Sequence, residues 1–167
     1  MILNRSIEYN KGMNIFVLST DPKEAAKMQC NKHVVKMILE SGQMLCAAHD
    51  PGMAPWKRTH YNHPCTVWAR TSTENYKWLA EHGLALCDEY TKRYSKVHKS
   101  KSVLVWCAEN IPKNVPVGNL TPFALAIKDP KYHLGDTVSS YRAYYLGEKN
   151  RFAKWKNCSP PSWWVDS

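Results

Sequence analysis

Four polar side chains of different chemistry share one narrow stripe of a helix predicted over residues 31–49. They are His33, Lys36, Glu40 and Gln43. At about 100° per residue they fall within an arc of roughly 80°, while apolar residues take the other directions. These groups suit proton transfer, stabilisation of a positive transition state and hydrogen bonding to a base edge. The stripe is either a polar face turned towards an internal cleft, which the apolar remainder of the helix favours, or a solvated face.

A second polar group comes just before a helix that we expect to begin at Pro64. His60, Asn62 and His63 precede that proline, so their side chains would lie beside exposed N–H groups that favour anions. Arg70 follows one to two turns later. The arrangement predicts a pocket for a phosphate or a carboxylate. Simple capping of the helix by Asn62 is the alternative.

The spacing of histidine and cysteine raises the question of zinc. Cys30 and His33 form a C-x-x-H pair, and His60, His63 and Cys65 form a second group. Neither spacing is that of a standard zinc finger, and the H-x-E plus P-C-x-x-C signature of deaminases is missing. The sequence also lacks P-loop, G-x-G-x-x-G and G-x-S-x-G motifs. We therefore predict neither a metal nor a cofactor, with zinc at these residues as the alternative.

The positive charge of the chain gathers in two windows. The net charge is +9, and it is accounted for by residues 90–101 and residues 142–156. Grouped Lys and Arg favour a polyanion, because binding releases condensed counterions. The predicted partner is DNA or a nucleotide phosphate, and the alternative is a merely solubilising surface. The residues expected to bind phosphate are Lys92, Arg93, Arg151 and Lys154.

Aromatic residues are interleaved with the cations of the second window. Bases stack on such rings while Arg and Lys hold the backbone, which suits single-stranded or flipped-out nucleotides. Trp68 and Tyr144 are the candidate stacking residues.

Length and composition indicate one compact, mainly α domain. A chain of 167 residues can form a core without disulfides, so its six cysteines are predicted to be free, mostly buried thiols of a reducing compartment. We expect a single helical domain over residues 13–167, with a short N-terminal extended segment and long irregular loops, after a leader or upstream extension over residues 1–12. No signal peptide or membrane span of roughly 20 apolar residues is recognisable, which predicts a cytoplasmic protein without a membrane partner.

Capping patterns indicate where the helices begin. Asp21, followed by a proline and then by an acid, should start the first of one or two helices that end near residue 49. Thr71 and Glu74 form an S/T-x-x-E pattern that should start a longer helix ending near residue 94. A shorter helix is expected within 98–110, and Asp136 should cap a later one.

Most of the chain after Met13 resembles a family of small phage and bacterial proteins of undefined activity. The strings that carry the resemblance are MNIFVLSTDP (13–22), CNKHVVKMILESGQ (30–43), YNHPCTVWAR (61–70), NYKWL (75–79), EYTKRYSKVH (89–98) and AYYLGEKNRFAKWK (143–156).

More remotely, the order of elements resembles that of the phage pyrimidine-dimer DNA glycosylases, which are also abasic-site lyases. The shared features are a short N-terminal segment, a helix with a central glutamate and an aromatic, basic C-terminus. The resemblance implies that Glu40 is the catalytic carboxylate. Those glycosylases use the free amine of a small second residue, whereas here Ile2 follows Met1 and a start at Met13 would expose Asn14.

These observations lead to one main hypothesis and two alternatives. The main hypothesis is a glycosylase-type enzyme that flips a damaged or modified pyrimidine into a cleft, where Glu40 stabilises the oxocarbenium ion or activates water and His33 or His63 assists the departing base. The first alternative is a non-catalytic protein that binds and sequesters a nucleotide. The second is a structural or replisome interaction protein, for which the basic windows would form a docking face.

Overall fold

The computed structural model describes residues 13–166, and within them it contains helices and no β-strand. The predicted mainly α class is confirmed. Residues 1–12 lie outside the described part, so the division of the chain at residue 13 stays a prediction. In chain order the elements are α2 (Pro22–Met28), α3 (Asn31–Ala47), α4 (Pro64–Ala69), α5 (Thr73–Tyr94), α6 (Lys101–Glu109), the short 3-10 helix η1 (Pro130–Tyr132), α7 (Thr137–Tyr144) and the π-helical turn η2 (Tyr145–Lys149).

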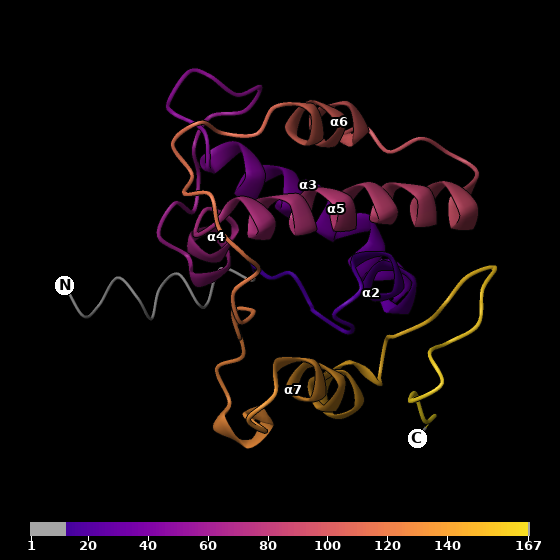
Figure 1. Cartoon of the computed structure of the whole chain (residues 1–167). Coiled ribbons are helices and arrows are strands. Elements are labelled where there is room, and N and C mark those ends of the chain that lie inside the picture. Colours follow the sequence, from indigo (N-terminus) through magenta and orange to yellow (C-terminus); the bar gives the residue numbers. More distant parts are fainter. Residues whose placement is uncertain (1–12, 167) are drawn as a thin grey trace.

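The long helix α5 runs through the middle of the molecule. It packs against α2, α3, α4 and α6, and α3 also contacts α4 and α6 (Figure 1). The buried face of α5 includes Tyr76, Leu79 and Leu86. At Gly83, a Cβ would lie 2.5 Å from Leu104 Cδ1, so any larger residue there would displace the Leu104 side chain between α5 and α6. The apolar sides of α3 are held against α4, α5 and α6, and one long face of α3 is left for other contacts.

Capping side chains begin the helices largely where the sequence predicts. The Asp21 carboxylate accepts hydrogen bonds from two backbone N–H groups at the start of α2, and Asp136 accepts one from Ser139 at the start of α7. The prediction for α5 is wrong by one residue. The cap is the Ser72 hydroxyl, which accepts from Asn75 N, while the Thr71 hydroxyl donates back to the carbonyl of Val67.

An extended segment over residues 13–18 lies buried between the helices. It is not a strand, because side chains rather than a neighbouring strand satisfy much of its backbone. Gln29 Nε2 donates to the carbonyls of Ile15 and Phe16 at 2.9 and 3.3 Å, and Arg142 Nε donates to that of Leu18 at 2.9 Å. The segment is therefore fixed both to the end of α2 and to α7.

The irregular regions agree with the sequence-based predictions. Residues 50–62 and 110–129 contain no helix. All six cysteines, which lie within the described residues, are free. Trp163 and Trp164 fold back, and both rings meet Tyr145 edge to face. No helix in the described part of the chain is both long and apolar enough to cross a bilayer.

The prediction that Arg93 binds phosphate is wrong, because its side chain is fully buried. Its guanidinium donates to the carbonyls of Gln29 and Lys27 at 2.7 and 3.0 Å and to the Glu89 carboxylate at 3.2 Å. The end of α2 leaves carbonyl groups without helical partners, and an arginine fork can satisfy several acceptors together. A basic window in the sequence does not distinguish such an internal cation from a surface one.

Replacing Arg93 by methionine should therefore destabilise the fold severely. Glu89 is 6% exposed and would remain as a buried carboxylate without its partner, next to carbonyls that lose their donors. We expect a loss of about 3–5 kcal/mol in the free energy of unfolding, measured by urea denaturation. Lys92→Met removes the neighbouring exposed cation and should change stability by no more than about 0.5 kcal/mol. Equal effects of the two changes would contradict this account of Arg93.

Candidate active site

Glu40 is a buried carboxyl group near the middle of α3. Its side chain is only 7% exposed. Oε1 accepts a hydrogen bond from the backbone N–H of Asn14 at 3.1 Å, and Oε2 lies 3.8 Å from Lys36 Nζ. The Lys36 side chain is 60% exposed, so it connects the buried carboxyl group with the outer face of the helix. Two of the four predicted residues on the stripe are thus in direct contact.

Burial raises the pKa of Glu40 to about 7, although Lys36 and the Asn14 N–H both act to lower it. Removing the carboxylate from water disfavours its charged form, and the nearby cation only partly compensates. A carboxyl group with a pKa near neutrality exchanges protons readily at physiological pH, as a general acid or base requires. Strongly shifted groups of this kind are concentrated in functional sites.

Asn14 is held in place by its own side chain. Its Oδ1 accepts hydrogen bonds from the N–H groups of Ile15 and Phe16, and its Nδ2 donates to the carbonyl of Ala126 at 3.1 Å. The tight turn forces Phe16 to a φ of 56°, in the left-handed region that non-glycine residues rarely adopt. Such strain persists only where surrounding contacts impose it, and it is common at functional sites.

His33 lies one to two turns from Glu40 in a largely apolar environment. Its ring stacks on Phe16 with centroids 4.0 Å apart, and its Nδ1 hydrogen-bonds with the Tyr145 hydroxyl. Burial, with the nearby cations Lys149 and Lys36, lowers the pKa of His33 to about 3. The imidazole is therefore neutral at pH 7 and does not carry the extra proton expected of an acid that assists a departing base.

Cations surround this end of α3. Lys149 Nζ lies over the rings of Tyr144 and Phe152, at 4.8 and 5.6 Å from their centroids, and Lys32 Nζ lies 4.7 Å from the Phe152 centroid. Tyr144 is half-buried, so part of its ring remains accessible. Lys149 thus places positive charge near His33, at the start of α3, and Lys36 does so beside Glu40.

The two basic windows meet at the start of α3. The carbonyl of Lys154 accepts a hydrogen bond from Asn31 N at 2.8 Å, and Lys156 Nζ lies 5.2 Å from the ring centroid of Tyr94, at the end of α5. Lys92, Arg151 and Lys154, three of the predicted phosphate-binding residues, are exposed. The fold thus gathers cations that are about 60 residues apart in the chain.

The other residues of the predicted cleft lie in different surroundings. Gln43 is half-buried on the same side of α3 as Lys36. The prediction that Trp68 stacks on a base is wrong, because it is 4% exposed and stacks on Phe123 with centroids 5.2 Å apart. Trp68 Nε1 also donates to the carbonyl of Thr121, so this ring belongs to the core.

The loop before α4 only partly fits the predicted anion pocket. His63 is buried and is itself the helix cap, since it accepts from Cys65 N at 3.1 Å, so Asn62 does not cap the helix. Burial lowers the pKa of His63 to about 4, with a smaller contribution from His60. His63 is therefore neutral at pH 7 and does not supply a positive charge. The three-residue group of His60, Asn62 and His63 does not form one polar surface.

Arg70 belongs to a separate aromatic and cationic cluster. Its guanidinium lies 3.7 Å from the Tyr61 ring centroid, and that of Arg58 lies 4.4 Å from the same centroid. Burial and the neighbouring Arg58 lower the pKa of Arg70, with Tyr61 acting in the opposite direction. Arg70 Nη1 also donates to the carbonyl of Tyr61. This cluster is not a part of the Glu40 site.

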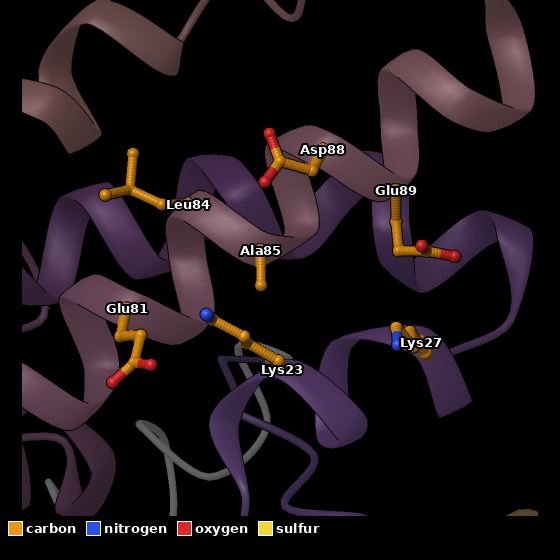
Figure 2. Close-up of a pocket in the computed structure, with 7 residues that line it drawn as sticks. All are labelled: Lys23, Lys27, Glu81, Leu84, Ala85, Asp88 and Glu89. Carbon is orange, nitrogen blue, oxygen red and sulfur yellow. The ribbon is translucent and has the colours of Figure 1, made fainter.

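A hollow of about 310 Å³ between α2 and α5 is distinct from this site (Figure 2). Its walls carry both charges, with Lys23 and Lys27 facing Glu81, Asp88 and Glu89. A phosphate there would meet three carboxylates, so this hollow is a poor candidate for the DNA site. Neither it nor the hollows of about 260 Å³ beside Trp106 and about 460 Å³ beside Val105 include Glu40 in their walls.

Among residues 13–166, no three histidine, cysteine or acidic side chains are grouped so that they could hold a metal ion.

Three residues at the site were not predicted: Asn14, Phe16 and Lys149. Asn14 contributes its backbone nitrogen, which no pattern of side chains can reveal. Lys149 stands in a predicted basic window, but its position over the aromatic rings depends on the fold.

The fold and the site define a helical protein with a proton-exchanging carboxyl group beside a cationic surface. The family model described as pyrimidine dimer DNA glycosylase matches residues 13–102. This match covers more than half of the chain, so the chain belongs to that family, and the resemblance inferred from the sequence is confirmed. No curated protein and no solved structure gives a significant match.

The raised pKa of Glu40 predicts that Glu40→Gln stabilises the protein at alkaline pH. An unfolded chain loses the proton near the ordinary pKa of 4.5, whereas the folded chain retains it up to about 7. The wild type should therefore lose stability as the pH rises through this interval, while a glutamine, which cannot ionise, should not. We expect a relative gain of up to about 3 kcal/mol for the variant between about pH 4.5 and 8.

Urea denaturation of both proteins at the two pH values measures this difference. Glu74→Gln, which removes an exposed carboxylate, controls for the loss of one negative charge. A difference between wild type and Glu40→Gln that stays constant with pH would contradict the assigned state of Glu40.

Proposed function

We propose that this protein removes a damaged or modified pyrimidine from DNA by cleaving its N-glycosidic bond, with Glu40 as the catalytic residue. Membership of the pyrimidine dimer DNA glycosylase family supports the reaction class. The single observation that carries the assignment of the residue is the buried carboxyl group of Glu40, hydrogen-bonded to Asn14 N and placed at the edge of a cationic surface.

In the proposed reaction, water adds to C1′ of the sugar while the bond from C1′ to the base nitrogen breaks. The electron pair of that bond leaves with the base, and positive charge develops on the sugar. The ionised Glu40 carboxylate stabilises this charge and takes a proton from the attacking water. The departing base takes its proton from solvent, because His33 and His63 are both neutral at pH 7. The products are the free base and an abasic sugar, or a base tethered to its neighbour where the lesion is a dimer.

Other residues would bind the DNA around the flipped nucleotide. Lys92, Arg151 and Lys154 are exposed and would hold phosphates, with Lys149 over the rings of Tyr144 and Phe152. The half-buried ring of Tyr144 would stack on a base. Gln43 lies on the same side of α3 and would hydrogen-bond to a base edge. Each phosphate contact of this kind makes binding weaker as the salt concentration rises.

Glu40→Gln should abolish most of the excision activity without abolishing DNA binding. Losing a general base costs about 10²- to 10⁴-fold in rate. The assay uses duplexes carrying a cyclobutane pyrimidine dimer, uracil or a modified thymine, and alkali cleavage reports the abasic sugar. Glu74→Gln is the matched control and should retain full activity. Intact glycosidic bonds with every duplex would overturn the proposal, and tight nucleotide binding unaffected by Glu40→Gln, with no product, would indicate sequestration instead.

The pH profile of excision provides a second test of the same residue. If the ionised carboxylate is the active form, the rate should rise with pH to a plateau, with a midpoint near the Glu40 pKa of about 7. Lys36 lowers this pKa, so Lys36→Met should move the midpoint to higher pH. A midpoint that is the same in both proteins would contradict the assignment.

A second activity depends on the same hydrogen bond. In the present chain Asn14 N is a peptide amide, which can donate a hydrogen bond but is not a nucleophile. A chain that begins at Asn14 would carry a free α-amine at this point, 3.1 Å from Glu40 Oε1 in the present geometry. The side chain of Asn14 has its own contacts to Ile15, Phe16 and Ala126, which help to hold this position. Such an amine could attack C1′ while the bond from C1′ to the base breaks and the base leaves with its electron pair. The nitrogen then loses its protons, the bond from C1′ to the ring oxygen opens with that oxygen taking a proton, and an imine with the sugar results.

We therefore expect a chain shortened to begin at Asn14 to gain abasic-site lyase activity. Borohydride should trap it covalently on DNA by reducing the imine, while the full chain should not be trapped above background. The shortened chain with Glu40→Gln is the control for the role of the carboxylate. Equal trapping of the full chain would place the nucleophile on a lysine rather than on Asn14.

A further inference from the structure

The outer face of α3 has a composition that its packing does not explain. Val35 and Leu39 are 40% and 43% exposed, although they stand one turn apart on a helix whose other apolar residues are buried. Lys32 and Lys36 are exposed on the same face. The only acid of α3 is Glu40, which is buried, so the outer face is apolar and cationic.

This face borders the candidate active site. The side chains of Leu39 and Glu40 point about 100° apart around the helix axis, and Lys36 projects between them. The opposite side of α3 packs against α5 and α6, and Asn14 lies against Glu40 on the inner side. Lys36 is exposed on the outer face and contacts Glu40, so this face comes within one ion pair of the buried carboxyl group.

We propose that this face penetrates duplex DNA, with Leu39 as the wedge that fills the space left when the target nucleotide is flipped towards Glu40. The inference rests on the proposed function. Flipping removes a base from the stack, and glycosylases must offset the lost stacking. Proteins that distort DNA commonly insert an apolar side chain between base steps, and leucine is one of the residues they use.

The spacing and charge of the outer face of α3 fit duplex DNA. Neighbouring residues of a helix rise only about 1.5 Å and point about 100° apart, so a side chain at position 39 can enter the base stack while the next one faces to the side of it, where a flipped nucleotide lies. Leu39 can therefore take the place of a base while Glu40 reaches the sugar of the flipped nucleotide. Lys32 and Lys36 lie together along one side of the two apolar residues and would meet phosphates there. The His98 ring lies 3.1 Å from the carbonyl of Val35, which brings a further cationic segment, with Lys96 and Lys99, to the border of the face.

Replacing Leu39 by alanine should slow the excision of a lesion from duplex DNA much more than its excision from single-stranded DNA. The wedge matters only where a stacked duplex must be opened. We expect Leu39→Ala to slow excision from a paired lesion at least tenfold and to change excision of the same lesion in a single strand less than twofold. Leu134→Ala is the matched control, because Leu134 is 55% exposed beside η1 and α7 and should have no effect on either substrate.

Fluorescence of 2-aminopurine next to an abasic site in a duplex reports insertion without requiring base removal. Binding of the wild type or Leu134→Ala should brighten the probe by unstacking it, whereas Leu39→Ala should bind and leave it dim. Equal brightening by Leu39→Ala, or equal slowing of excision on both substrates, would overturn the wedge. If the wild type brightens the probe but excises nothing, the wedge stands and the proposed reaction fails. In a further outcome, the wild-type protein forms a dimer that Leu39→Ala converts to a monomer while the probe signal stays the same. That result would assign the face to contact with a second copy of the chain and overturn the proposal.

Discussion

The hydrogen bond from Asn14 N to Glu40 is the contact on which the rest of the site depends. A carboxyl group that is nine-tenths buried or more requires partners, and here the partners are one backbone N–H and one lysine at 3.8 Å. The backbone donor has to be carried to the middle of α3 by an extended segment. Gln29, Arg142 and the Asn14 side chain fix that segment to three separate parts of the molecule. Much of the architecture around α3 thus serves to place one nitrogen atom.

Opposing effects, of which burial is the largest, leave Glu40 near the point of half-ionisation at pH 7. Burial favours the neutral acid, while Lys36 and the Asn14 N–H favour the carboxylate. With more exposure the group would be ionised at all physiological pH values, and without Lys36 it would hold its proton more firmly. Nearby cations lower the pKa of His33 too, but there they add to the effect of burial, so the imidazole is kept neutral by burial and by Lys149. One small region therefore contains a carboxyl group that exchanges its proton and a histidine that does not.

The sequence predicted the helices well because their limits are determined by local chemistry. Asp21 and Asp136 cap the predicted helices, and the 100° periodicity of α3 placed His33, Lys36 and Glu40 on one side. Arg93 and Trp68 were assigned to DNA because composition alone does not show whether a cation or a ring points outwards. Both are buried by contacts with residues distant in the sequence, Gln29 for Arg93 and Phe123 for Trp68. Asn14 was missed for a related reason, since its role comes from a main-chain atom and a tertiary contact.

Buried and exposed cations have complementary roles in the two basic windows, residues 90–101 and 142–156. Arg93 is unavailable to phosphate, yet it joins α2 to α5, and its carbonyl accepts a hydrogen bond from Asn157 just beyond the second window. Asn31 completes the connection, because its N–H donates to the carbonyl of Lys154 and its side chain accepts from Lys156 N. The exposed lysines of the irregular C-terminal segment are therefore positioned by main-chain bonds to the start of α3, the helix that carries Glu40. The cations and the carboxyl group are both fixed to α3. A phosphate that the cations hold therefore has a defined position relative to the Glu40 carboxyl group.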